Sequence, residues 1–238
     1  MCRVTEYVDT LSGVFDSGWP KMDVLGSPRI ATSGVIMEET IQPDYQAFLN
    51  FWFGSVEQTV IPTRRRACVW FGDNVEVNKD ICIRFSQAHQ DAIMGKLAYW
   101  EKMPHGQLAL ILLYDQLSRH LFLNSAEAFD YDGHALKVCL LGLGRVDHEL
   151  SLIERVFFYF PLLHAENLEI QQLSLQCYDV LLSLALPETK LVYDSFLRFA
   201  SHHYSIIRQF GRFPQRNRLL GRDSTAEELA YLKEEEGG

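Results

Sequence analysis

Hydrophobic residues recur with a helical period along most of the chain from about residue 43 onward. Between Tyr45 and Phe53, aromatic and aliphatic residues fall at i, i+3, i+4, i+7 and i+8, the spacing of one helical face. The same spacing, with capping and stop residues at its ends, predicts further helices over about 78–95, 107–120, 125–142, 149–159, 165–186 and 192–211, and a short one after Thr225.

Several residues indicate where these helices begin and end. Asn78 is a predicted N-cap, and Gly54 and Gly211 are predicted C-terminal stops. Pro161 is predicted to end the helix before it, because proline cannot donate a backbone hydrogen bond. The last helix is predicted to begin at one of two overlapping capping boxes, Ser224/Glu227 and Thr225/Glu228.

The fold class follows from this pattern. Because neither a convincing strand ladder nor an alternation of strands and helices is present, we expect an all-α fold, with antiparallel helical hairpins in an array or bundle. The 34-residue period of tetratricopeptide repeats does not recur in the chain. The helices predict a single domain over residues 41–233. Residues 1–40 contain glycine and proline without a sustained period and are predicted to be a poorly ordered N-terminal arm, and residues 234–238 an acidic tail.

Composition narrows the range of partners. The 238 residues include 22 Lys and Arg against 31 Asp and Glu, and the net charge of −9 argues against nucleic acid or anionic membrane as a partner. The five cysteines are scattered without a CxxC pair, which favours a reducing cytoplasm. No apolar run approaches the roughly 20 residues needed to span a bilayer. We therefore predict a cytoplasmic protein.

Polar residues inside apolar helices are the first candidates for function. Asp115 and Arg119 follow an apolar run at i and i+4, so they lie on one helical face. They are interpreted either as a structural ion pair or as an arginine that points into a pocket, oriented by the aspartate. His164 and Glu166 are either an acid–base pair, with Glu166 orienting the histidine, or residues that serve a helix entry. His203 lies on the apolar face of its helix, where a satisfied core histidine is the commoner case.

Positive charge is concentrated near the C-terminus. Residues 208–222 contain five arginines and no acidic residue, and the guanidinium group matches the geometry of carboxylate and phosphate. One interpretation is that these arginines hold the last helix down. The other is an anion site that is built from Arg212, Arg216 and Arg222.

Motifs for the common cofactors are missing, so no cofactor is predicted. The sequence has no HExxH, GxSxG, Walker A or GxGxxG motif in a suitable context. The separation of Asp115, His164, Glu166 and His203 differs from usual metal-ligand spacings, and we therefore predict no metal site.

Two runs near the C-terminus, residues 211–217 (GRFPQRN) and 220–225 (LGRDST), carry a family resemblance. With matching residues from about 45 to 232, the chain resembles the domain of unknown function 924 family, which is mostly bacterial. The resemblance implies a tetratricopeptide-like all-helical fold and no established activity. The family usually has histidine where this chain has Gln215, and Pro-Arg-Asn where it has Ser118, Arg119 and His120. If the histidine at the position of Gln215 has a chemical role in the family, its replacement by glutamine weakens the hypothesis that this chain is an enzyme.

Three functional hypotheses follow. The first is a binding protein for a small anionic ligand or an acidic peptide, and the second a hydrolase or transferase acting on an anionic metabolite with His164, Glu166 and an arginine clamp. In the third, the polar residues are structural and the outer surface binds other proteins. The candidate ligand-binding residues are Asp115, Arg119, His203, Arg212, Arg216, Asn217 and Arg222, with His164 and Glu166 as catalytic candidates.

Overall fold

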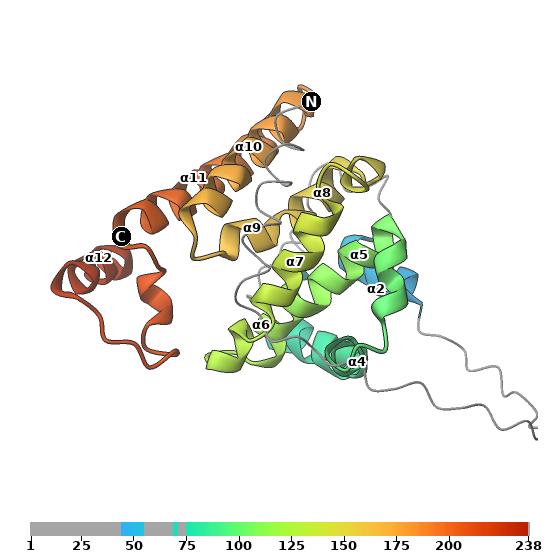
Figure 1. The fold of residues 1–238 in the computed structure, drawn as a ribbon, viewed down its shortest axis with the longest axis horizontal. Helices are drawn as coiled ribbons and strands as arrows, with labels where there is room; N and C mark the ends of the chain where they lie inside the picture. Colours follow the sequence, from blue (N-terminus) through green and yellow to red (C-terminus); the bar gives the residue numbers. More distant parts are fainter. Residues whose placement is uncertain (1–43, 55–68, 71–74, 238) are drawn as a thin grey trace, which may run out of the picture. The chain divides into compact units, whose positions relative to one another are not determined.

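The computed structural model describes residues 44–54, 69–70 and 75–237, in which helices and turns occur without a strand. The predicted arm, residues 1–40, lies outside the described residues. Residues 45–238 belong to one unit. Its α-helices are α2 (Tyr45–Phe53), α4 (Val75–Ile93), α5 (Pro104–Ile111), α6 (Ser118–Leu121), α7 (Asp132–Gly142), α8 (Leu152–Phe158), α9 (Phe160–His164), α10 (Leu168–Leu184), α11 (Lys190–Phe210) and α12 (Ala226–Gly237) (Figure 1).

Short helical turns connect several of these helices. They are the 3-10 turns η2 (Ala98–Lys102), η4 (Ala126–Phe129), η5 (Asp147–Glu149) and η6 (Pro214–Arg216), and the π-helical segment η3 (Leu112–Leu117) between α5 and α6. The all-α prediction is confirmed. None of the helices that the structure describes is long and apolar enough to cross a membrane.

The segment predicted as a central apolar helix lies in the core. All side chains from Leu108 to Leu113 are buried, and α5 packs against α2, α7, α8 and η2. This segment is not one uniform α-helix, because it widens to a π-helix at Leu112. A π-helix hydrogen-bonds over five residues instead of four, and such segments are frequent at functional sites. Here η3 holds two consecutive polar residues in the interior, Asp115 and Gln116.

Helices α10 and α11 form a hairpin, lying side by side along their length (Figure 1). Asn167 begins α10 by accepting a hydrogen bond from the backbone N–H of Ile170. Gly211 ends α11 at the predicted position, with a φ of 71° that favours glycine. The Thr225/Glu228 capping box forms at the start of α12, where each residue's side chain bonds the other's backbone N–H. Residues 234–237, predicted as a tail, continue this helix.

Three predicted boundaries differ from the structure. Asn78 lies inside α4 and does not cap it. Its side chain hydrogen-bonds His120 instead. Ser125 caps the short turn η4, and α7 begins only at Asp132. Pro161 occupies the first turn of α9, where its missing N–H costs nothing, so it starts a helix as well as separating two.

Candidate functional site

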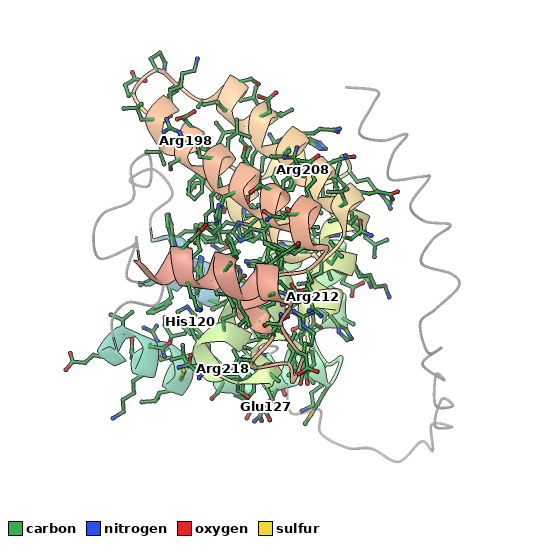
Figure 2. All side chains as sticks on the ribbon, turned by 90° about the vertical axis from the view of Figure 1, so that its left-hand side faces the viewer. His120, Glu127, Arg198, Arg208, Arg212 and Arg218 are labelled. Atoms are coloured by element: carbon green, nitrogen blue, oxygen red, sulfur yellow. The ribbon has the colours of Figure 1, made fainter. Side chains whose placement is uncertain are left out.

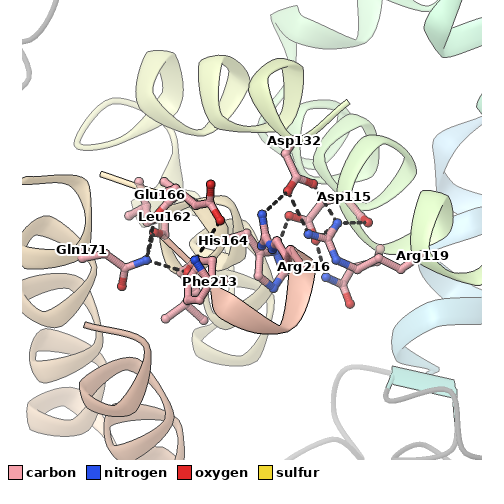
Figure 3. A network of polar contacts seen from close by, with 12 residues as sticks. Asp115, Arg119, Asp132, Leu162, His164, Glu166, Gln171, Phe213 and Arg216 are labelled. Carbon is pink, nitrogen blue, oxygen red and sulfur yellow. Dashed lines mark hydrogen bonds and ion pairs between the residues drawn. The ribbon is translucent and has the colours of Figure 1, made fainter. Parts of the chain in front are cut away.

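Polar side chains from six different elements meet near the C-terminal end of α9, and Figure 3 shows Asp115, Arg119, Asp132, His164 and Arg216 close together. They are joined by hydrogen bonds, ion pairs and ring contacts, each of which is described below. We refer to them as the polar cluster, which consists of Asp115 (η3), Arg119 (α6), Asp132 (α7), His164 (α9), His203 (α11) and Arg216 (η6).

Asp115 is the fully buried member of the polar cluster, with 0 % of its side chain exposed. Its Oδ2 lies 2.6 Å from Nδ1 of His164, and its Oδ1 accepts a hydrogen bond of 2.5 Å from Gln116 Nε2. Arg119 Nη1 lies 3.4 Å from the same Oδ1. Burial acts to raise the pKa of Asp115, but Arg119 and His164 outweigh it and hold this pKa well below its usual range. Asp115 is therefore a carboxylate, and His164 Nδ1 must be the donor.

Asp132 is the cluster member that sequence reasoning missed. Both of its oxygens bind Arg119, at 2.9 and 3.0 Å, and Oδ2 also lies 3.3 Å from Nη1 of Arg216. Asp132 is an acidic residue in the first turn of α7. A carboxylate at this position is favourable to the helix dipole, so its presence needs no functional explanation. No local signal distinguishes it, because its two partners lie 13 and 84 residues away.

The guanidinium group of Arg216 contacts two aromatic rings. Its guanidinium carbon lies 4.7 Å from the ring centre of Phe129 and 4.6 Å from that of Phe213. Only Nη1 is paired, with Asp132, so within the described part of the chain Nε and Nη2 have no hydrogen-bond partner. Burial lowers the pKa of Arg216, which Asp132 only partly offsets. With 12 % of its side chain exposed, this arginine offers two unused donors close to the surface.

His203 contacts both His164 and Phe213, the ring that also contacts Arg216. Its ring centre lies 5.4 Å from that of Phe213 and 6.4 Å from that of His164. Its Nδ1–H donates to the carbonyl of Phe199 at 3.0 Å, so its Nε2 carries the free lone pair. Burial and the neighbouring His164 lower the pKa of His203 to about 4, and it is therefore neutral at pH 7.

His164 is positioned from two sides. Its Nδ1 bonds Asp115, and the backbone around it is held by Gln171, whose Nε2 donates to the carbonyls of Leu163 at 2.6 Å and Ala165 at 2.9 Å. Burial and Arg119 lower the pKa of His164. With 13 % of the side chain exposed, its Nε2 has no hydrogen-bond partner among the residues that the structure describes.

Glu166 is not the partner of His164 that the acid–base hypothesis assumed. Its two oxygens bind Arg222 at 2.6 and 2.9 Å, and Oε1 also accepts the backbone N–H of Phe213 at 2.8 Å. Arg222 in turn bonds the side chain of Asn217 at 2.9 Å. Although burial acts to raise the pKa of Glu166, these donors lower it. Glu166 thus ties the C-terminal segment to the chain before α10.

Arg212 and Asn217 complete this C-terminal clasp, which we define as Glu166, Arg212, Asn217, Arg222 and Glu228. Arg212 binds Glu228 with two hydrogen bonds, of 2.7 and 2.9 Å, and Asn217 reaches the same carboxylate at 3.2 Å. The hydrogen bonds from Arg212 and the backbone of Thr225 lower the pKa of Glu228 to about 2.

Figure 2 places Arg212 and Arg218 on the segment after α11, and Arg198 and Arg208 on α11 itself. The tie-down interpretation therefore fits Arg212 and Arg222, whereas Arg216 belongs to the polar cluster.

The fold and these contacts define an all-helical protein with a mostly buried polar cluster of two arginines, two histidines and two aspartates. A model of the family described as "Bacterial protein of unknown function (DUF924)" matches residues 48–236, and the chain belongs to this family. The predicted family resemblance is thus confirmed.

A solved structure gives the same picture of the fold. It is that of the protein of unknown function ATU0120 from Agrobacterium tumefaciens, which is 31 % identical to this chain. The match covers 80 % of this chain and 97 % of that one, with a TM-score of 0.65. None of the curated proteins matches the chain.

Proposed function

We propose that the protein binds a small anionic ligand at the polar cluster, through the free edge of Arg216 and the Nε2 atoms of His164 and His203. The observation that carries this proposal is the arrangement of Arg216. A guanidinium group that only stabilised the fold would pair most of its donors with protein acceptors, as those of Arg212 and Arg222 do. Arg216 instead uses Nη1 alone and leaves Nε and Nη2 unpartnered within the described residues.

The size and charge of the site favour a small ligand. Arg119 and Arg216 balance Asp115 and Asp132, so the polar cluster has no net charge when both histidines are neutral. The affinity for an anion therefore depends on short-range hydrogen bonds from the guanidinium group, whose planar geometry matches a carboxylate or a phosphate group. Since Arg216 and His164 are 12 % and 13 % exposed, a compact anion reaches them more readily than a long acidic peptide.

A thermal-shift screen tests this proposal. Carboxylates and phosphates of up to about ten heavy atoms, and short acidic peptides, would be tested on the wild type and on Arg216→Gln. Arg198→Ala serves as the matched control, because Arg198 is exposed on α11 and, among the described residues, pairs only with Asp194. We expect small anions to raise the melting temperature of the wild type and the control, but not of Arg216→Gln. Stabilisation by peptides alone, or equal shifts in all three proteins, would contradict a small-anion site at Arg216.

An enzymatic role is the second candidate, and the pairing of His164 with Asp115 favours it. A carboxylate bound to Nδ1 fixes the tautomer of a histidine and orients its Nε2 as a general base. In this version a hydrolase or transferase acts on the bound anion, and Asp115 takes the orienting role first assigned to Glu166. Turnover of a stabilising ligand that disappears in His164→Asn would favour the enzyme. Binding without turnover would favour the binding protein.

A further inference from the structure

The two histidines of the polar cluster present the same chemical group to a ligand. His164 Nδ1 donates to a carboxylate and His203 Nδ1 donates to a backbone carbonyl, and neither acceptor can be a donor. A neutral imidazole carries one proton, so both Nε2 atoms are hydrogen-bond acceptors. The lowered pKa values of both rings keep them neutral at pH 7. The site therefore combines guanidinium donors with two acceptors.

An acceptor of this kind selects among anions. A fully deprotonated oxyanion offers only acceptors, and its oxygens repel the lone pair of a neutral imidazole nitrogen. An anion that carries its own O–H can satisfy both sides, with its charged oxygens on the arginine and its hydroxyl donating to Nε2. Leaving such an acceptor unpaired in a mostly buried site costs enough free energy to change affinity roughly tenfold to a hundredfold.

We infer that the ligand of the polar cluster is an oxyanion with a hydroxyl donor beside its charge, which Arg216 binds through the oxyanion while His203 or His164 accepts from the hydroxyl. This inference rests on the proposed function and adds one requirement to it, namely that the ligand carries a hydroxyl group that donates a hydrogen bond. Two sources share the chemistry. One is a hydrogen phosphate group, whose P–OH is part of the anion itself, and the other is a 2-hydroxy carboxylate, whose hydroxyl lies on the neighbouring carbon.

Two pairs of anions that differ in this donor provide the test. Inorganic phosphate carries an O–H at pH 7.5 and sulfate does not, although the two are alike in shape. Among carboxylates, lactate carries a hydroxyl group on the carbon next to the carboxylate, and propionate lacks it. Titration calorimetry at pH 7.5 and constant ionic strength would measure the four dissociation constants for the wild type, Arg216→Gln and His203→Phe. The His203→Phe variant keeps an aromatic ring at this position but has no nitrogen that can accept a hydrogen bond.

We expect phosphate to bind at least about tenfold more tightly than sulfate, or lactate than propionate, and the preferred pair identifies the source. The preference should shrink in His203→Phe or in His164→Phe, because each variant lacks the accepting nitrogen, and Arg216→Gln should weaken all binding. Equal affinities within both pairs, with binding still dependent on Arg216, would overturn this inference and leave the proposed function standing. Absence of binding by all four anions would instead count against the proposed function.

A measurement on the wild type keeps the inference testable if the histidine variants do not fold. Nitrogen-15 spectra of the histidine rings report which ring nitrogen carries the proton. We expect His164 and His203 to be protonated at Nδ1 only, and their Nε2 resonances to move on addition of phosphate but not of sulfate. Protonation at Nε2 of both rings in the free protein would overturn the inference directly.

Discussion

Replacing Asp115 by asparagine removes the charge at the centre of the polar cluster while keeping the shape of the side chain. The carboxylate is fully buried and serves His164, Gln116 and Arg119, so its loss weakens charge-assisted hydrogen bonds to all of them. Breaking a buried pair by removing one partner costs about 3–5 kcal/mol. Arg119 retains two bonds to Asp132, which limits the uncompensated charge, and we therefore expect a loss of about 3 kcal/mol.

The pH dependence of this loss gives a second signature. The pKa of Asp115 is lower in the folded than in the unfolded chain, so its stabilising contribution is present above the usual carboxyl pKa of about 4 and is lost as pH falls through the folded pKa. The difference between wild type and Asp115→Asn should thus be largest at pH 7 and should begin to narrow as the pH falls below about 4.

Urea unfolding followed by tryptophan fluorescence would measure this loss at pH 7 and at pH 3.5. Thermal unfolding should show a decrease of about 6–12 °C, from about 2–4 °C per kcal/mol for a domain of this size. Asp179→Asn is the matched control, because Asp179 is exposed on α10. The reasoning would be refuted if Asp115→Asn stayed within about 0.5 kcal/mol of the wild type at pH 7, the range of ordinary surface substitutions.

Further predictions concern other parts of the fold. Gly142→Ala should cost about 1–3 kcal/mol in chemical denaturation, since its Cβ would overlap Oε1 of Gln107 and would lie 2.7 Å from the ring of Phe158; an unchanged midpoint would contradict this close packing. Carbon-13 NMR should find Glu228 titrating near pH 2, and a value near 4.5 would mean that the pair with Arg212 does not form in solution. Burial raises the pKa of Cys177 to about 12, so iodoacetamide at pH 8 should modify this thiol only after unfolding, as site-resolved mass spectrometry would report; rapid modification of the native protein would contradict its burial.

The helices could largely be predicted from the sequence, because their patterns are local. The apolar stripe of α11 and the glycine that ends it lie within one stretch of 21 residues, and the structure agrees with both. Asn78 shows where local reasoning fails. Its side chain is attractive as an N-cap, but His120, which lies 42 residues away, binds it instead. The π-helical segment was not predicted either, since a uniformly apolar run has no periodicity from which a widened turn could be detected.

The candidate site could be predicted only in part, for the same reason. Sequence reasoning found Asp115, Arg119, His164, His203 and Arg216, because each is a polar residue in an unusual place, and all of them lie in the polar cluster. Their pairing was not predictable. Proximity in the chain suggested that Glu166 would orient His164, yet the fold brings Asp115 to it from 49 residues away. The cluster also needs Asp132, and nothing in the sequence separates that residue from an ordinary helix-start aspartate.

The central claim is that Arg216, and neither Arg212 nor Arg222, binds an anion. Titration calorimetry with inorganic phosphate and with lactate on the wild type, Arg216→Gln and Arg212→Ala tests it directly, with circular dichroism to confirm that each variant is folded. We predict that at least one of the two anions binds the wild type and Arg212→Ala with the same affinity, and that its binding is lost in Arg216→Gln. Loss of binding in Arg212→Ala with retention in Arg216→Gln would contradict the account.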